Sequence, residues 1–187
     1  MGNEDDKKFT VWRFTDKPLR LSWVDHLEEL YTGSPDGVLD FCGQLGPPSK
    51  LKSETSLHRD FCVFRYDAVP MWEDAHISNM KLRLTLQGDA EIDAVWWRSL
   101  MLLLSAKSDL AMVSGLCLQI RKKFTVSFWL YGEHVMKAAE KPEKQIILDI
   151  AQCWKMALGI SDGAIEVSRR SPRGYRKAFT ALVWRSV

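Results

Sequence analysis

The fold class that the sequence predicts is a single α+β domain, and three observations lead to it. The segment from Lys81 to Leu86 alternates polar and apolar residues, which is typical of a strand with one buried face. Two strand-like segments, 116–121 and 124–131, are separated only by a very short turn and therefore form a hairpin. Three other segments are predicted as helices, two of them because apolar residues recur at helical spacing. This combination indicates an antiparallel sheet with helices on one face.

The other elements follow from local signals. Phe9 to Phe14 is predicted as the first strand and Phe61 to Tyr66 as a second. Ser34-Pro35 combines an N-cap with a proline at the first helical position, so a helix begins there and runs to about Leu45. Gly46-Pro47-Pro48 stops this helix, and residues 47–59 are expected to form a polar loop.

The second and third helices lie later in the chain. Asp89 is predicted to cap a long helix whose apolar positions are Ile92, Val95, Trp96, Leu100 and Leu103. The third helix covers about Pro142 to Leu158 and ends at Gly159. Segments 164–168 and 179–184 are predicted as closing strands.

Size and composition bound the protein class. With 187 residues we expect one domain over 9–187, preceded by a flexible tail over 1–8. Apolar residues make up 46% of the chain, which excludes wholesale disorder, and the net charge is only +2. Attraction to polyanions must therefore come from locally concentrated charge. The polar N-terminus does not resemble a signal peptide, and no stretch reaches the roughly 20 apolar residues of a membrane span.

Cysteine and histidine spacing gives no sign of a metal site. The cysteines show no Cys-x-x-Cys pair, so we expect reduced thiols in a cytosolic or nuclear protein; they are Cys42, Cys62, Cys117 and Cys153. The histidines are expected at the surface without a metal; they are His26, His58, His76 and His134.

Eight tryptophans are more than core packing usually needs, because each buried indole N–H must find an acceptor. Alternation in segment 124–131 turns Phe124, Val126 and Phe128 towards the helices and Thr125, Ser127 and Trp129 to the other face. In segment 116–121, Leu116, Leu118 and Ile120 are the core set, which leaves Gln119 and Arg121 outside. The sequence thus predicts an exposed Trp129 beside Arg121 on a face that no helix covers.

Two further tryptophans lie in predicted loops. Trp72 is followed by Glu73, and a flat ring beside a carboxylate suits guanine, although Trp72 could equally fold back on the core. Trp23 follows the first strand, so the two rings could sandwich one base, with stacking worth roughly 1–3 kcal/mol per base. A positively charged base would gain on the order of 2 kcal/mol more by cation–π attraction.

Pro70-Met71-Trp72-Glu73-Asp74 resembles the signature of the eukaryotic translation initiation factor 4E family, which binds the 7-methylguanosine cap of mRNA. The landmarks in matching order, from about Phe9 to the C-terminus, are Trp12, Trp23, Trp96, Arg121 and Trp129. The resemblance implies a curved antiparallel sheet with three helices on its convex face and the cap on its concave face. It implies that Trp23 and Trp72 sandwich the base, that Glu73 pairs with its Watson–Crick edge and that Trp129 contacts the N7-methyl group. Arg121 would hold the phosphates with Lys122 or Lys123, and no cofactor is implied.

The hairpin after Arg121 is one residue shorter than the family pattern, so the choice between Lys122 and Lys123 stays open. Cys42 stands where the family has the helix tryptophan that binds scaffold and repressor peptides. The resemblance implies a convex partner surface of Val38, Cys42, Trp97 and Met101. The expected partner is a scaffold of the initiation factor 4G type or an unconventional interacting protein.

Residues 169–177 hold five cations in nine residues and are expected to form a loop near the cap. Its candidate phosphate contacts are Arg169, Arg170, Arg173, Arg176 and Lys177, and Tyr175 could stack on the next nucleotide.

The sequence therefore predicts a cytoplasmic cap-binding protein, which could also be nuclear, and not an enzyme. A phosphate-binding loop, a nucleophile elbow and a His-Glu-x-x-His motif are all absent from it. Three alternatives stay open: a cap-binding repressor with an unconventional partner, a general single-stranded RNA binder, and a cap-hydrolysing enzyme. The enzyme would need clustered carboxylates for metal ions, and the sequence offers only Glu73-Asp74.

Overall fold

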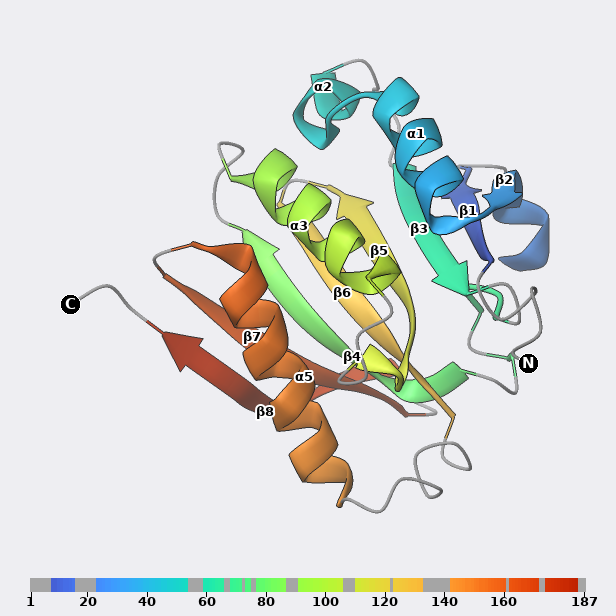
Figure 1. Ribbon diagram of the computed structural model, residues 1–187. Coiled ribbons are helices and arrows are strands. Elements are labelled where there is room, and N and C mark those ends of the chain that lie inside the picture. The colour runs from blue at the N-terminus through green and yellow to red at the C-terminus, as the bar shows by residue number, and fades with distance from the viewer. Residues whose placement is uncertain are drawn as a thin grey trace, which may run out of the picture.

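The computed structural model describes residues 8–15, 23–53, 59–65, 68–71, 73–74, 77–86, 91–105, 110–121, 123–132, 142–160, 162–171 and 174–184. Within these residues, eight strands form one sheet in the order β2-β1-β3-β5-β6-β4-β7-β8 (Figure 1). The strands are β1 (Phe9–Phe14), β2 (Leu27–Gly33), β3 (Arg59–Arg65), β4 (Ile77–Leu86), β5 (Val113–Ile120), β6 (Phe124–Tyr131), β7 (Gly163–Ser171) and β8 (Gly174–Trp184). Every neighbouring pair is antiparallel, which confirms the predicted type of sheet.

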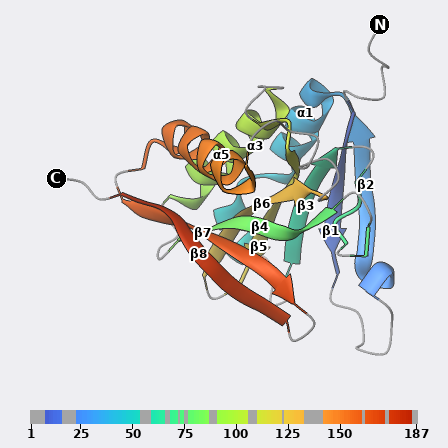
Figure 2. The ribbon, with the colours of Figure 1, turned by 90° about the horizontal axis from the view of Figure 1, so that it is seen from below.

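The three long helices cover one face of this sheet (Figure 1, Figure 2). The helices are α1 (Pro35–Leu45), α2 (Pro48–Ser53), α3 (Ile92–Leu104) and α5 (Glu143–Leu158), and a short 3-10 turn, η2, covers Trp23–His26. The sheet curves away from these three long helices, which lie over its convex side (Figure 2). The architecture is therefore the predicted α+β domain. Within the described residues, no helix is both long enough and apolar enough to cross a membrane.

Local chemistry sets the helix ends. The Ser34 hydroxyl accepts a hydrogen bond from the Gly37 backbone N–H at 3.3 Å, as an N-cap should. Gly159 ends α5 with a φ of 61°, in the left-handed region where a side chain would be strained. Both boundaries agree with the sequence prediction.

The core lies between the helices and the convex face of the sheet. The inward residues of β6 are Phe124, Val126 and Phe128, all of them buried as predicted. Trp154 of α5 packs on Phe128 with ring centroids 4.5 Å apart, and its indole N–H donates to the Ser99 hydroxyl of α3 at 2.8 Å. Because this face is sealed, any ligand site on the sheet must lie on the concave side.

The 3-10 turn η2, one strand and one helix were not predicted from the sequence. Strand β2 was not expected, and the predicted polar loop over 47–59 contains α2. A tertiary contact stabilises this helix: the backbone N–H and the hydroxyl of Ser49 both donate to the Asp93 carboxylate, at 2.9 and 2.6 Å.

The surface position predicted for His26 is also wrong. Its ring stacks on Phe14 with centroids 5.3 Å apart, and its Nδ1 lies 2.9 Å from the Thr15 carbonyl oxygen, so the side chain is buried. The prediction that Asp89 caps the long helix is wrong, because the N-cap residue of α3 is Glu91. Asp89 itself and the other three histidines lie outside the described residues.

Candidate functional site

The concave face of the sheet carries a pocket of about 290 Å³. This volume is at the lower end of the roughly 300–1,000 Å³ typical of small-ligand sites. Its described lining residues come from six strands of the sheet, β1 to β6, and from the segment before β4. They are Phe14, Leu27, Asp60, Cys62, Pro70, Lys81, Arg83, Cys117, Gln119, Ser127 and Trp129. The pocket therefore combines aromatic, apolar and charged groups on the face that the sequence assigned to recognition.

Trp129 lies on the floor of this pocket. Alternation in β6 turns it away from the helices, as predicted, and it packs edge-on against Phe64 at 5.5 Å between centroids. Gly115 stands opposite Trp129 in the neighbouring strand, and a Cβ there would collide with the Phe64 ring. The expectation that Trp129 is exposed is wrong, because only 5% of its surface is accessible. It can therefore offer a ligand only the part of its ring that reaches the pocket.

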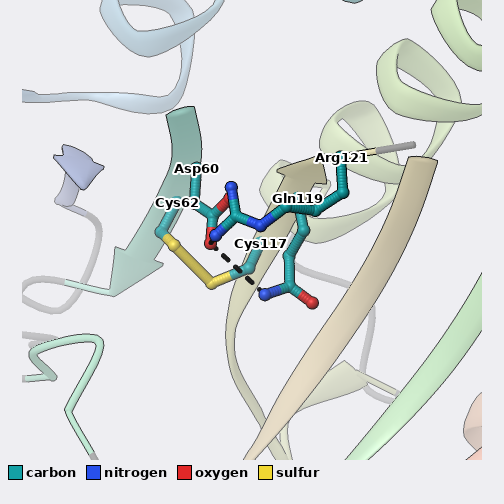
Figure 3. The surroundings of a disulfide bond; sticks show 5 residues. All are labelled: Asp60, Cys62, Cys117, Gln119 and Arg121. Atoms are coloured by element: carbon teal, nitrogen blue, oxygen red, sulfur yellow. Dashed lines mark hydrogen bonds and ion pairs between the residues drawn. A yellow bond between two sulfur atoms is a disulfide. The ribbon is translucent and has the colours of Figure 1, made fainter. Parts of the chain in front are cut away.

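An ion pair joins Arg121 to the pocket wall. Arg121 follows β5, and its guanidinium lies 2.9 Å from Oδ1 of the buried Asp60 on β3. The Gln119 amide donates to the other oxygen of Asp60 at 3.3 Å (Figure 3). Burial raises the pKa of Asp60, and the charge of Arg121 opposes this shift. Arg121 is thus held beside the pocket, as the sequence predicted, with about a third of its side chain exposed.

Cys62 and Cys117 form a disulfide on the pocket floor (Figure 3). The two residues are direct partners in the β3–β5 register, with Cα atoms 4.1 Å apart. The expectation of reduced thiols is therefore wrong for this pair, because strand pairing joins two cysteines that are 55 residues apart in sequence. Cys42 and Cys153 lie outside this disulfide and are buried, which agrees with the expected reduced thiols.

The segment that carries the predicted Trp72-Glu73 pair is a turn held by Asp74. The Val69 N–H donates to the Asp74 carboxylate at 2.7 Å, and the Asp74 N–H donates to the Met71 carbonyl at 3.3 Å. Glu73 is exposed and lies 3.3 Å from the Arg170 guanidinium of β7. Trp72 is outside the described residues, as are Lys122 and Arg173, and for Trp23 only the backbone, which begins η2, is described.

A family model described as eukaryotic initiation factor 4E matches residues 6–177 of the chain. The chain belongs to this family.

Similar proteins agree with this assignment. The chain is 29% identical over 133 residues to translation initiation factor 4E-1 of Caenorhabditis elegans, covering 66% of this chain and 60% of that protein. It is 32% identical over 116 residues to translation initiation factor 4E of Saccharomyces cerevisiae, covering 58% of this chain and 49% of that protein. The chain thus spans about half to three fifths of the length of these relatives.

Solved structures show the same fold. Ascaris suum eIF4E-3, solved with an m2,2,7G cap, superimposes with a TM-score of 0.72 at 17% identity, covering 92% of this chain and 94% of that one. Schistosome eIF4E, solved with m7GpppA and 4E-BP, gives a TM-score of 0.70 at 22% identity, covering 89% and 87%. The curved sheet with helices on its convex side is therefore the initiation factor 4E fold.

The basic stretch over 169–177 lies in a hairpin of this fold, and the expected loop is wrong. β7 continues to Ser171 and β8 begins at Gly174, with Arg169 opposite Arg176 and Arg170 opposite Tyr175. The Arg169 guanidinium pairs with Glu143 at the start of α5, 2.7 Å away. Arg170 reaches Glu73 instead, so the hairpin contacts the turn before β4. The side chains of Tyr175, Arg176 and Lys177 are not among those described.

Two pocket cations, Lys81 and Arg83, were missed from the sequence. The clean alternation over 81–86 assigned Leu82, Leu84 and Leu86 to the core, so it also placed both cations on the opposite face. The sequence alone did not give the strand order, which sets β4 beside β6 and so brings both cations to the pocket. Lys123, by contrast, is exposed in the turn between β5 and β6.

Only some residues of the implied partner surface on the convex side are exposed. Val38 and Cys42 are buried, with 0% and 4% exposed, because α1 turns this side onto the sheet and α3. Burial raises the pKa of the Cys42 thiol to about 12. The placement of these two residues on a partner surface is therefore wrong. Trp97 is half-buried and Met101 is 59% exposed on α3, so both remain accessible to a partner.

Proposed function

We propose that this protein binds the 7-methylguanosine cap of mRNA in the concave pocket and acts in translation initiation or its regulation, without catalysing a reaction. The observation that supports this most strongly is the pocket itself. On the concave face of an initiation factor 4E fold it brings together Trp129 and the Asp60–Arg121 pair, beside the turn that carries Glu73. Related structures of this fold were solved in complex with cap ligands, an m2,2,7G cap and m7GpppA.

Base recognition uses planar rings and one carboxylate. Trp23 and Trp72 would stack on the two faces of the methylated base, and its positive charge would strengthen both contacts by cation–π attraction. Glu73 would accept hydrogen bonds from the N1–H and amino groups of guanine. These hydrogen bonds would replace its exposed contact with Arg170. Trp129 on the pocket floor would contact the N7-methyl group.

The phosphates would lie towards the turn between β5 and β6. Arg121 already stands there, oriented by Asp60, and Lys122 or Lys123 would add a second charge. The nucleotides after the cap would follow towards the β7–β8 hairpin, where Arg170 lies beside Glu73. Arg173, Tyr175, Arg176 and Lys177 are the proposed RNA contacts of this hairpin, whereas Arg169 is engaged by Glu143.

Protein partners would bind the helical side, leaving the pocket free. Related structures contain the 4E-binding protein Mextli or 4E-BP. In this chain the accessible candidates on α3 are Trp97 and Met101, and the buried Cys42 offers a partner no ring to contact. A scaffold of the initiation factor 4G type, or an unconventional protein that relies on α3, is the proposed partner.

Fluorescence titration tests the cap proposal. We expect 7-methyl-GTP to quench the intrinsic tryptophan fluorescence, and Trp72→Ala to weaken binding by about tenfold or more, since stacking contributes roughly 1–3 kcal/mol per base. Trp97→Ala removes an indole from the helical side and serves as the matched control, with wild-type affinity expected. Equal affinities of the Trp72→Ala variant and the wild type would exclude the stacking mechanism.

A further inference from the structure

The disulfide between Cys62 of β3 and Cys117 of β5 belongs to a row of side chains that crosses the concave face of the sheet (Figure 3). Trp12 of β1 stands directly opposite Cys62, and Ser127 of β6 stands directly opposite Cys117. Cross-strand partners in antiparallel pairs lie on the same face, with Cβ atoms about 5 Å apart. Both cysteines and Ser127 line the ligand pocket, so the disulfide is part of its floor.

The route to the sulfur atoms in the folded protein leads through this pocket. On the opposite face of β3 and β5, the side chains of Val63, Leu116 and Leu118 are buried in the core beneath the helices. Only 6% of Cys62 and 4% of Cys117 are exposed. Thiol–disulfide exchange requires a thiolate to reach one of the two sulfur atoms. A small thiol must therefore enter the pocket before it can react with this bond.

Two buried hydrogen-bond donors flank the disulfide. Within the described residues, neither the indole Nε1 of Trp12 nor the hydroxyl of Ser127 has a hydrogen-bond partner. Native proteins rarely bury polar atoms in this way. Hydrogen bonds to an ionised acceptor are roughly twice as strong as those between neutral groups, so a thiolate at either cysteine would be a favourable partner for these donors. The surroundings therefore favour the cleaved, ionised form of the pair more than an apolar site would.

Cys42 provides a contrast within the same chain. Apolar side chains such as Val11 and Leu45 line the small cavity beside it. Burial raises the pKa of its thiol to about 12, so this thiol stays protonated and unreactive. The Cys62–Cys117 pair instead has polar neighbours and faces the ligand pocket.

We propose that Cys62 and Cys117 form a redox-active site, at which a small dithiol enters the ligand pocket and reversibly reduces the disulfide. One thiolate of the dithiol attacks Sγ of Cys62, which breaks the bond to Cys117 and leaves a mixed disulfide. The Ser127 hydroxyl donates to the departing Cys117 thiolate, which then takes up a proton. The second thiol of the reagent attacks the mixed disulfide, releases Cys62 as a thiol and leaves as a cyclic disulfide. Two electrons and two protons thus pass from the dithiol to the cysteine pair.

A bound nucleotide and the dithiol should exclude each other from the pocket. This consequence rests on the proposed cap function, which identifies the nucleotide. If the pocket holds only one of them at a time, the fraction of empty pockets sets the rate of reduction. At a ligand concentration of about ten times the Kd, roughly a tenth of the pockets are empty, so the nucleotide should slow reduction by about tenfold.

Reduction of the folded protein by dithiothreitol tests the site, with the new thiols trapped by alkylation and located by mass spectrometry. We expect labels on Cys62 and Cys117, and slower labelling in the presence of 7-methyl-GTP. Ser127→Ala should slow the reduction by about threefold or more, because the departing thiolate loses a charged hydrogen bond. Ser105→Ala removes a hydroxyl at the end of α3, on the helical side, and should react at the wild-type rate.

Ser99→Ala distinguishes this route from the reduction of unfolded chains. This variant loses the acceptor of the Trp154 indole in the core and should therefore unfold more readily. Reduction that requires unfolding would become about fivefold faster or more in the variant, and Cys42 would be labelled at the same time. Reduction through the pocket should keep the wild-type rate and leave Cys42 unlabelled.

The outcomes separate this inference from the function on which it rests. The redox site is refuted if dithiothreitol leaves the folded protein unlabelled, if Ser99→Ala accelerates the reaction, or if Ser127→Ala leaves its rate unchanged. If 7-methyl-GTP binds but does not slow the reduction, the route through the pocket is refuted and cap binding stands. If 7-methyl-GTP does not bind, the cap function fails, and the rates of Ser99→Ala and Ser127→Ala decide the redox site by themselves.

Discussion

Reduction of the Cys62–Cys117 disulfide should destabilise the fold by an amount that follows from the sequence separation it closes. The bond joins residues 55 positions apart, on the adjacent strands β3 and β5. In the chain-entropy description, closing a loop of this length lowers the entropy of the unfolded chain by an amount worth about 4 kcal/mol at 25 °C. For a chain of this size, each kcal/mol moves the melting temperature by about 2–4 °C. The expected drop on reduction is therefore about 8–16 °C.

Thermal unfolding followed by circular dichroism, with and without a phosphine reductant, measures this drop. The control is the double variant Cys62→Ser and Cys117→Ser, whose melting temperature should be low and should not respond to the reductant. Thiol titration of the unfolded protein, purified without reductant, should find only two thiols, those of Cys42 and Cys153, which lie outside the disulfide. Four reactive thiols, or a melting temperature that reduction leaves unchanged, would refute the structural role assigned to the bond.

Three further predictions concern other buried groups. Ser99→Ala should lower the free energy of unfolding by about 1–3 kcal/mol, because the Trp154 indole N–H would lose its acceptor inside the core; denaturant titration measures this, and no change would contradict it. Lys81→Met should stabilise the fold at neutral pH by up to about 3 kcal/mol, because the pKa of Lys81 is lowered from 10.5 to about 8 in the folded state. Between these two pKa values the unfolded chain binds one proton more than the folded protein, so wild-type stability should rise from about pH 8 to 10.5. The stability advantage of the variant should vanish over the same range, and an advantage independent of pH would contradict this. Cys42→Trp should destabilise the protein by about 1–3 kcal/mol, because the adjoining cavity of about 10 Å³ cannot hold an indole, and an unchanged melting temperature would show that α1 can move outward.

The sequence predicted those features that depend on local chemistry. The N-cap at Ser34 and the left-handed conformation of Gly159 confirm the helix ends that were predicted from these single residues. Alternation assigned both faces of β5 and β6 correctly, and with them the side of the sheet on which Trp129 lies.

Features that depend on contacts between distant segments were missed. Helix α2 begins at Pro48, directly after Pro47, and is held by Asp93 of α3, 44 residues away from Ser49, which no local pattern reveals. In the described part of the sheet, strand β2 lies at the edge beside β1, and its exposed Glu28 and Glu29 interrupt the alternation that would have predicted it.

The same limit applied to the site. The pocket cations Lys81 and Arg83 became recognisable only when the strand order set β4 beside β6. The disulfide could be recognised only from the strand register, which sets Cys62 opposite Cys117. The basic stretch over 169–177 was expected as a loop because its charged side chains favour contact with solvent. Its backbone N–H and C=O groups instead form the hydrogen bonds of the β7–β8 pair.

The affinity ratio of the wild-type protein for 7-methyl-GTP and unmethylated GTP, measured by calorimetry at one salt concentration, tests the central claim most directly. The two ligands carry the same phosphates, so the ratio isolates the positive charge and the methyl group of the base. Cation–π attraction on the order of 2 kcal/mol in a desolvated slot predicts at least about tenfold tighter binding of the methylated nucleotide. Equal affinities would contradict cap recognition and would favour a general binder of phosphorylated, single-stranded RNA.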